Sequence, residues 1–159
     1  MTPLHVPRLH PAQALLLGGL TVGTVDILDA IVFFGARGVS AERILQSIAA
    51  GLLGREAFDG GLLTAVLGLV LHYFIAFAVA GTFLLASGRS PALRRNWVAA
   101  GLGYGVLVYA MMNFVVLPLS RAGHGHPSFV VLLNGLLIHA FGVGLPSAYA
   151  ARLGSVAES

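Results

Sequence analysis

Hydrophobic positions run along the chain in four long blocks, each near the roughly 20 residues that a helix needs to span a bilayer. The blocks cover residues 14–35, 61–86, 97–120 and 128–151. A membrane β-barrel would instead show alternating segments of roughly ten residues, and the sequence has none. Because lipid offers backbone groups no partner outside their own helix, the pattern predicts an all-α integral membrane four-helix bundle. We expect a single transmembrane domain over residues 1–159.

A shorter amphipathic segment lies between the first two blocks, over about residues 40–53. Its apolar residues recur at helical spacing, namely Ile44, Leu45, Ile48 and Leu52. Ser40 is placed to cap the start of a helix, and Gly54 is placed to end it. The segment is too short to span a bilayer, so we expect an interfacial amphipathic helix or one that dips back into the bundle. It would act either as a gate or as a plain surface connector.

The composition agrees with a membrane protein, because 57% of the residues are hydrophobic and only 9% are charged. Soluble globular proteins carry roughly 25% charged residues. The chain has no cysteine, which excludes disulfides, thiolate catalysis and cysteine-ligated metals. The net charge is +3, and no basic stripe is interleaved with aromatics, so nucleic acid is not an expected partner. All nine basic residues are arginine, which is typical of a GC-rich bacterial genome.

The arginines outside the four blocks indicate an orientation in the membrane. The side of the termini and second loop carries five, and the opposite side carries four: Arg8, Arg89, Arg94, Arg95 and Arg152 against Arg37, Arg43, Arg55 and Arg121. We therefore expect a multi-pass protein of the bacterial inner membrane with both termini in the cytoplasm. The first block continues past the length of a signal-peptide core without a clean cleavage site, so we expect an uncleaved first span.

Polar residues inside the spans carry the candidate chemistry, because an ionisable side chain there costs several kcal/mol and almost always faces the bundle interior. They are Asp26 and Asp29 in the first span, His72 in the second, Asn113 in the third, and Asn134 and His139 in the fourth. At about 1.5 Å per residue, both histidines lie roughly 16 Å deep and Asp26 roughly 14 Å, with the other three at roughly 9–10 Å. The six residues therefore predict one cavity with an ionisable floor, opening on the side of the first and third loops.

Each of the two histidines follows a glycine by one helical turn, in Gly68–His72 and Gly135–His139. The two units are 67 residues apart, which would fit a parallel internal repeat of helix pairs. Small residues on such a stripe let a neighbouring helix approach closely, so each histidine is expected at a helix–helix contact. The structural alternative is that Asp26, Asp29 or an asparagine simply satisfies each histidine.

The polar residues leave several functions open. Buried aspartates and histidines suit a proton relay in a carrier or channel. Two histidines at equal depth could also ligate haem b, or hold a divalent metal with the two aspartates. His124 and His126 in the third loop are a weaker metal candidate. The sequence shows no nucleophile with a matching base, no phosphate loop and no metalloprotease signature, so it gives no indication of an enzyme.

Five segments carry a resemblance that extends over nearly the whole chain, from Gly19 to about Arg152: "GTVDILDA", "LQSIAAGLLG", "LGLVLH", "MNFVVLPLS" and "LLNGLLIH". In them the chain resembles a family of uncharacterised small four-span bacterial inner-membrane proteins. The resemblance implies an inner-membrane location and brings no activity, cofactor or assigned site.

We therefore expect a small membrane protein whose cavity binds a proton, ion or small polar ligand, in a transport-related or accessory role. A haem- or metal-binding redox subunit and an assembly subunit of a larger complex are the alternatives. The lipid bilayer is the expected partner, and a homodimer is plausible because four spans are few for a carrier.

Overall fold

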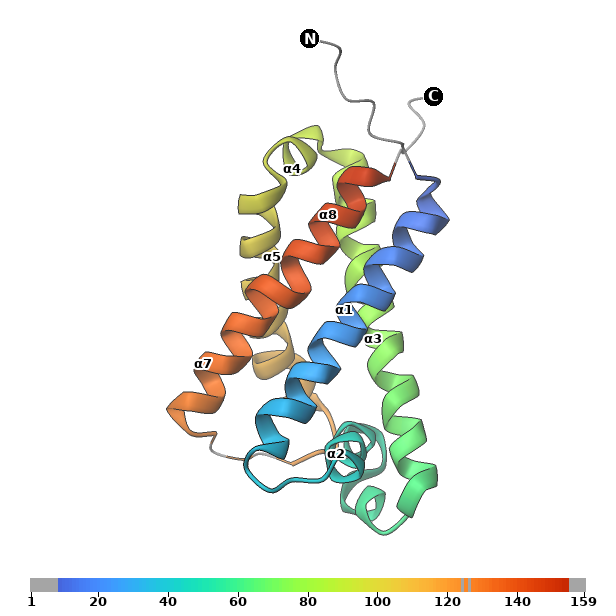
Figure 1. Ribbon diagram of the computed structural model, residues 1–159, viewed down its shortest axis with the longest axis vertical. Coiled ribbons are helices and arrows are strands. Elements are labelled where there is room, and N and C mark those ends of the chain that lie inside the picture. Colours follow the sequence, from blue (N-terminus) through green and yellow to red (C-terminus); the bar gives the residue numbers. More distant parts are fainter. Residues whose placement is uncertain (1–8, 124, 126, 155–159) are drawn as a thin grey trace.

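The protein is a bundle of helices in which four long spans lie along one common axis and alternate in chain direction (Figure 1). The computed structural model describes residues 9–123, 125 and 127–154. The first span is α1 (Pro11–Gly35) and the second is α3 (Gly61–Arg89). The third, Trp97–Leu119, joins α5 (Trp97–Met111), the π-helical segment η2 (Met112–Val116) and α6 (Leu117–Leu119). The fourth, Phe129–Leu153, joins α7 (Phe129–Ile138), the π-helical segment η3 (His139–Gly144) and α8 (Leu145–Leu153).

All four spans are long and apolar enough to cross a membrane, so the chain is a multi-pass membrane protein. The predicted all-α four-helix bundle is confirmed. Three short elements complete it: α2 (Ala41–Leu53) and the 3-10 turn η1 (Gly54–Phe58) between the first two spans, and α4 (Pro91–Arg95) between the second and third.

Helix α2 is the amphipathic helix expected between the first two spans. The Ser40 side chain accepts a hydrogen bond from the Arg43 amide at 3.2 Å, and α2 ends at Gly54 with a φ of 72°. Figure 1 shows α2 almost end-on beside the spans, so it lies across the bundle rather than along it. It is fastened to the start of α3, where the buried Gln46 side chain donates to the Gly61 carbonyl at 3.1 Å.

Small residues fill the inside of the bundle, and large apolar residues face outward. Alanines make up much of the buried core, whereas Leu62, Leu63, Phe74 and Phe114 are among the exposed side chains. This distribution suits lipid, in which helices associate through close backbone approach rather than through burial of large apolar groups. Gly19 and Gly23 of α1 receive aromatic rings of α3, and Gly101 and Gly105 of α5 lie against the backbone of the fourth span.

Each of the last two spans contains a π-helical segment next to a proline. Pro118 and Pro146 have no amide hydrogen to offer the carbonyl four residues earlier, at Phe114 and Gly142. Both of these carbonyls lie within the π segments. The wider π turn lets the helix continue where a regular α-helix would meet the proline ring. The two segments contain Asn113 and His139, so the irregular turns coincide with predicted site residues.

Candidate functional site

A pocket of about 680 Å³ lies inside the bundle between α1, α2, α3, the third span and η3. Its walls are mostly aliphatic and aromatic side chains, including Val22, Phe34, Ile75 and Met112. Six polar or charged residues line it as well: Asp26, Arg43, Ser47, His72, Asn113 and His139. A mainly apolar pocket with a few converging polar groups is the usual form of a small-molecule site.

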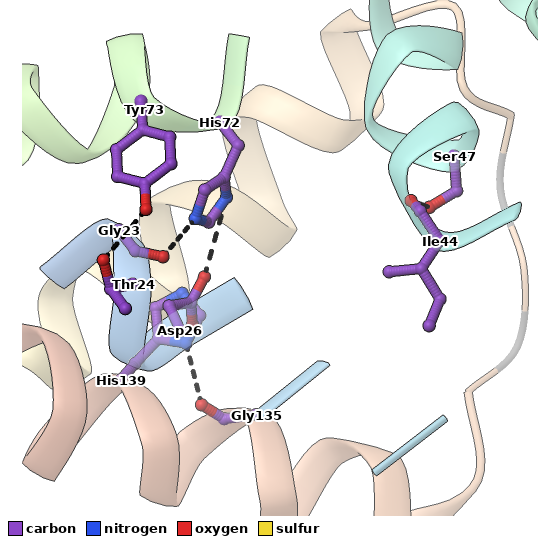
Figure 2. A network of polar contacts seen from close by, with 9 residues as sticks. All are labelled: Gly23, Thr24, Asp26, Ile44, Ser47, His72, Tyr73, Gly135 and His139. Carbon is purple, nitrogen blue, oxygen red and sulfur yellow. Dashed lines mark hydrogen bonds and ion pairs between the residues drawn. The ribbon is translucent and has the colours of Figure 1, made fainter. Parts of the chain in front are cut away.

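Asp26 and the two histidines come together on the wall formed by α1, α3 and η3. The Asp26 carboxylate lies 4.0 Å from Nδ1 of His72, with 27% and 11% of the two side chains exposed. Asp26 is also within electrostatic range of His139. Figure 2 shows these three residues in the same part of the bundle, with α2 on the opposite side of the pocket.

Each imidazole has one nitrogen held by a backbone carbonyl. Nε2 of His72 lies 2.8 Å from the Gly23 carbonyl of α1, and Nδ1 of His139 lies 2.9 Å from the Gly135 carbonyl one turn earlier (Figure 2). A carbonyl oxygen can only accept, so the hydrogen-bonded nitrogen must carry the proton in both rings. This fixes the neutral tautomers and leaves Nδ1 of His72 and Nε2 of His139 as the nitrogens that can gain a proton.

The remaining predicted residues form a second polar group beside the first. The Asn134 amide donates to the Asp29 carboxylate at 2.8 Å, which joins the fourth span to the first. Both residues line a smaller pocket of about 230 Å³, which Asp26, Asn113 and His139 also line. The Asn113 amide donates one N–H to the Tyr109 carbonyl at 2.9 Å, so its second N–H and its side-chain oxygen are left for other partners. The six residues are therefore divided between two adjoining pockets.

The glycines that precede the two histidines serve different contacts. A side chain on Gly68 would overlap the Leu45 carbonyl of α2, so this glycine accommodates the backbone of α2. A side chain on Gly135 would lie 2.8 Å from the Tyr109 ring, which itself meets His139 edge to face at 5.5 Å. The contact made by His72 is with α1. The alternative that Asp or Asn side chains satisfy the histidines does not describe the hydrogen bonds, since both partners are backbone carbonyls.

Helix α2 forms one wall of the pocket, and the sequence pattern did not predict this wall. Arg43, Ile44, Ser47 and Ile48 line the pocket from α2, and Phe58 lines it from the following turn. The Arg43 guanidinium stacks 4.3 Å from the centre of the Phe58 ring. Arg43 and Ser47 are one helical turn apart and share a face, which is a signal that the sequence does contain. What the sequence lacks is the direction in which α2 turns that face.

The histidine geometry bears on the haem and metal interpretations. Ligation of iron through Nε2 of His72 would break its hydrogen bond to Gly23, whereas His139 keeps Nε2 for a ligand. No group of three His, Cys, Asp or Glu side chains that could hold a metal ion occurs within the described part of the chain. His124 and His126 lie outside the described residues.

Comparisons with protein-family models, curated proteins and solved structures found no match to this chain.

Proposed function

We propose that this membrane protein binds a proton and a small ligand together in the pocket around Asp26, His72 and His139. Its role in the bacterial inner membrane is transport-related or accessory. The observation that carries the proposal is one partly buried carboxylate beside two imidazoles, each of which has one ring nitrogen already hydrogen-bonded to a backbone carbonyl, of Gly23 or Gly135.

The fixed tautomers make the pair of Asp26 and His72 dependent on a proton. Without one, the carboxylate oxygen and the Nδ1 lone pair face each other as two acceptors at 4.0 Å. With one proton, the pair is either carboxylic acid with imidazole or carboxylate with imidazolium, and both forms are attractive. A net negative charge in a site of low polarity is costly, so the resting site holds one proton and is neutral. The 4.0 Å separation leaves room for a bridging water or a polar ligand atom between the two groups.

His139 offers the proton a second position on the other side of the site. Its Nε2 is a proton acceptor, and its ring stands against Tyr109 rather than in open solvent. Asp26 is within electrostatic range of both rings, so a proton on either histidine is stabilised by the same carboxylate. Such a set of exchangeable positions is what a proton-coupled binding site requires.

The proposal is tested by titrating the protein in lipid nanodiscs. Infrared difference spectra report the protonated Asp26 carboxyl through its C=O band, and nitrogen-15 NMR of labelled histidine reports both rings. We expect the carboxyl and histidine signals to change together with pH, because interacting groups titrate as a unit. In Asp26→Asn the carboxyl band disappears, and the histidine signals should differ from those of the native protein because the neighbouring carboxylate is gone.

Asp59→Asn is the matched control, because Asp59 is exposed outside the pocket and its replacement should leave these signals unchanged. Signals of His72 and His139 that are identical in the native protein and in Asp26→Asn would refute the proton site.

A further inference from the structure

We propose that the ligand of this pocket is an apolar amine, whose ammonium group takes the place of the bound proton at Asp26, His72 and His139. The inference deepens the proposed function and depends on it. It follows from the hydrogen-bonding character of the three groups once the proton has left.

The deprotonated site presents only acceptors. Nε2–H of His72 and Nδ1–H of His139 are both committed to backbone carbonyls. What these three residues still offer a ligand is the Asp26 carboxylate, Nδ1 of His72 and Nε2 of His139, and all three line the same pocket. A primary ammonium group has three N–H donors and one positive charge, as the lysine side chain does. It therefore matches three acceptors with a net charge of −1, whereas an anion or a neutral acceptor such as a ketone does not.

The rest of the pocket suits an apolar skeleton attached to that amine. Aliphatic and aromatic side chains make up most of the lining, for example Val79, Val108, Leu117 and Phe58. The volume of about 680 Å³ is within the roughly 300–1,000 Å³ of small-molecule sites. A bare ammonium or metal ion would leave most of this space without contacts, so the pocket favours an organic amine.

The other charged and titratable groups around Asp26 have partners of their own, so they do not bind the Asp26 carboxylate in place of the ligand. Asp29, one turn further along α1, is bonded to Asn134 of α7. Tyr109 of α5 directs its hydroxyl to the Leu132 carbonyl at 3.1 Å, and Tyr73 of α3 is paired with Thr24 at 2.9 Å. Arg43 of α2 lines the pocket from another wall, where its guanidinium stacks on Phe58 rather than pairing with Asp26.

The exchange conserves charge in the pocket. The neutral site loses one proton to solvent and gains one ammonium group, so its net charge is zero before and after. No covalent bond forms or breaks apart from the bond to the departing proton. One proton is therefore released for each amine bound, and raising the proton concentration should displace the amine.

The test uses 4-phenylbutylamine as the probe, with protein in nanodiscs and empty nanodiscs as the background. Equilibrium dialysis gives its affinity at several pH values, and a pH-sensitive dye in weak buffer counts released protons. The matched probe without charge is 4-phenylbutan-1-ol, and 4-phenylbutyrate carries the opposite charge. We expect one proton released per amine bound, and an amine affinity that falls about tenfold for each unit by which the pH is lowered in the range where the site is protonated. The alcohol and the carboxylate should bind at least about tenfold more weakly than the amine.

Asp26→Asn should lose the proton release and at least about tenfold in amine affinity, while the exposed control Asp59→Asn should behave as the native protein does. Equal affinity for the amine and the alcohol, without proton release, would overturn the proposal that the ligand is an amine. This comparison needs no variant. Tighter binding of the carboxylate, lost in Arg43→Gln, would overturn it in favour of an anion. If Asp26 titrates together with the histidines but amine binding releases no proton, the amine proposal fails and the proposed function stands. If Asp26 does not titrate with the histidines, the proposed function fails as well.

Discussion

Replacing Gly68 by alanine tests whether α2 is seated on α3 by direct backbone contact. The added Cβ would overlap the Leu45 carbonyl oxygen and lie 2.7 Å from the Leu45 carbonyl carbon and 3.3 Å from the Ala49 amide nitrogen. These are backbone atoms of α2, so no side chain can rotate away to make room. Carbon atoms pack best at about 3.5–4.0 Å, so α2 must move away from α3 by about 1 Å.

The expected cost is about 1–3 kcal/mol of stability, the range found when an extra group is forced into a packed interior. Helix α2 carries Ile44 and Ile48 of the pocket lining, so the same shift should also change amine affinity. Stability can be measured as the shift in unfolding when sodium dodecyl sulfate is added to protein in a mild detergent. The tryptophan signal of Trp97 and helix content by circular dichroism give two readouts of the same transition.

Gly103→Ala is the matched control, because a Cβ at Gly103 has no neighbour within 4 Å. It makes the same chemical change in another span. Alanine should be neutral there, or stabilising by up to about 1 kcal/mol through its better helix propensity. Equal unfolding of the Gly68 and Gly103 variants, with unchanged amine affinity in both, would refute the close contact between α2 and α3.

Two further variants test polar contacts between spans by the same unfolding assay. Asn134→Leu leaves the Asp29 carboxylate without its 2.8 Å donor and should cost about 1–3 kcal/mol; the double variant Asp29→Leu/Asn134→Leu should recover most of that loss, and no recovery would contradict an energetic role for the pair. Tyr104→Phe removes the 2.7 Å hydrogen bond from Tyr104 to the Val79 carbonyl and should cost about 0.6 kcal/mol, the average for such bonds in membranes. A loss of several kcal/mol would contradict this, since the Tyr104 ring still packs on Phe83.

The spans and α2 could be predicted from the sequence because each depends on local patterns. Apolar length defines a span, and Ser40 and Gly54 define α2 through the hydrogen bond and the backbone angle that they provide. Helical rise also gives depth, and the residues estimated to be deepest, Asp26, His72 and His139, line one pocket in the structure.

Rotation about each helix axis could not be predicted in the same way. The partner of His72 is a carbonyl of α1, and a backbone group leaves no mark in the sequence pattern. The separation of Asp29 and Asn134 into a second pocket also depends on rotation. The π segments follow from Pro118 and Pro146 only once the helices are known to continue past them. The placement of Arg43 at the pocket depends on how α2 packs on α3, which no residue of α2 encodes alone.

The parallel bridge between Leu9 and Gly154 makes the two ends of the bundle differ in how the first and fourth spans are joined. There the Leu9 amide donates to the Leu153 carbonyl at 2.8 Å, which clasps the start of α1 to the end of α8. Helix α8 beside this clasp buries several of its residues, whereas α7 at the far end of the same span buries none. The two ends of the bundle are therefore tied in different ways: backbone groups join the first and fourth spans at the clasp, and the Asn134 and Asp29 side chains join them at the other end. A side-chain substitution can therefore remove the second tie, whereas only a change of backbone conformation can remove the first.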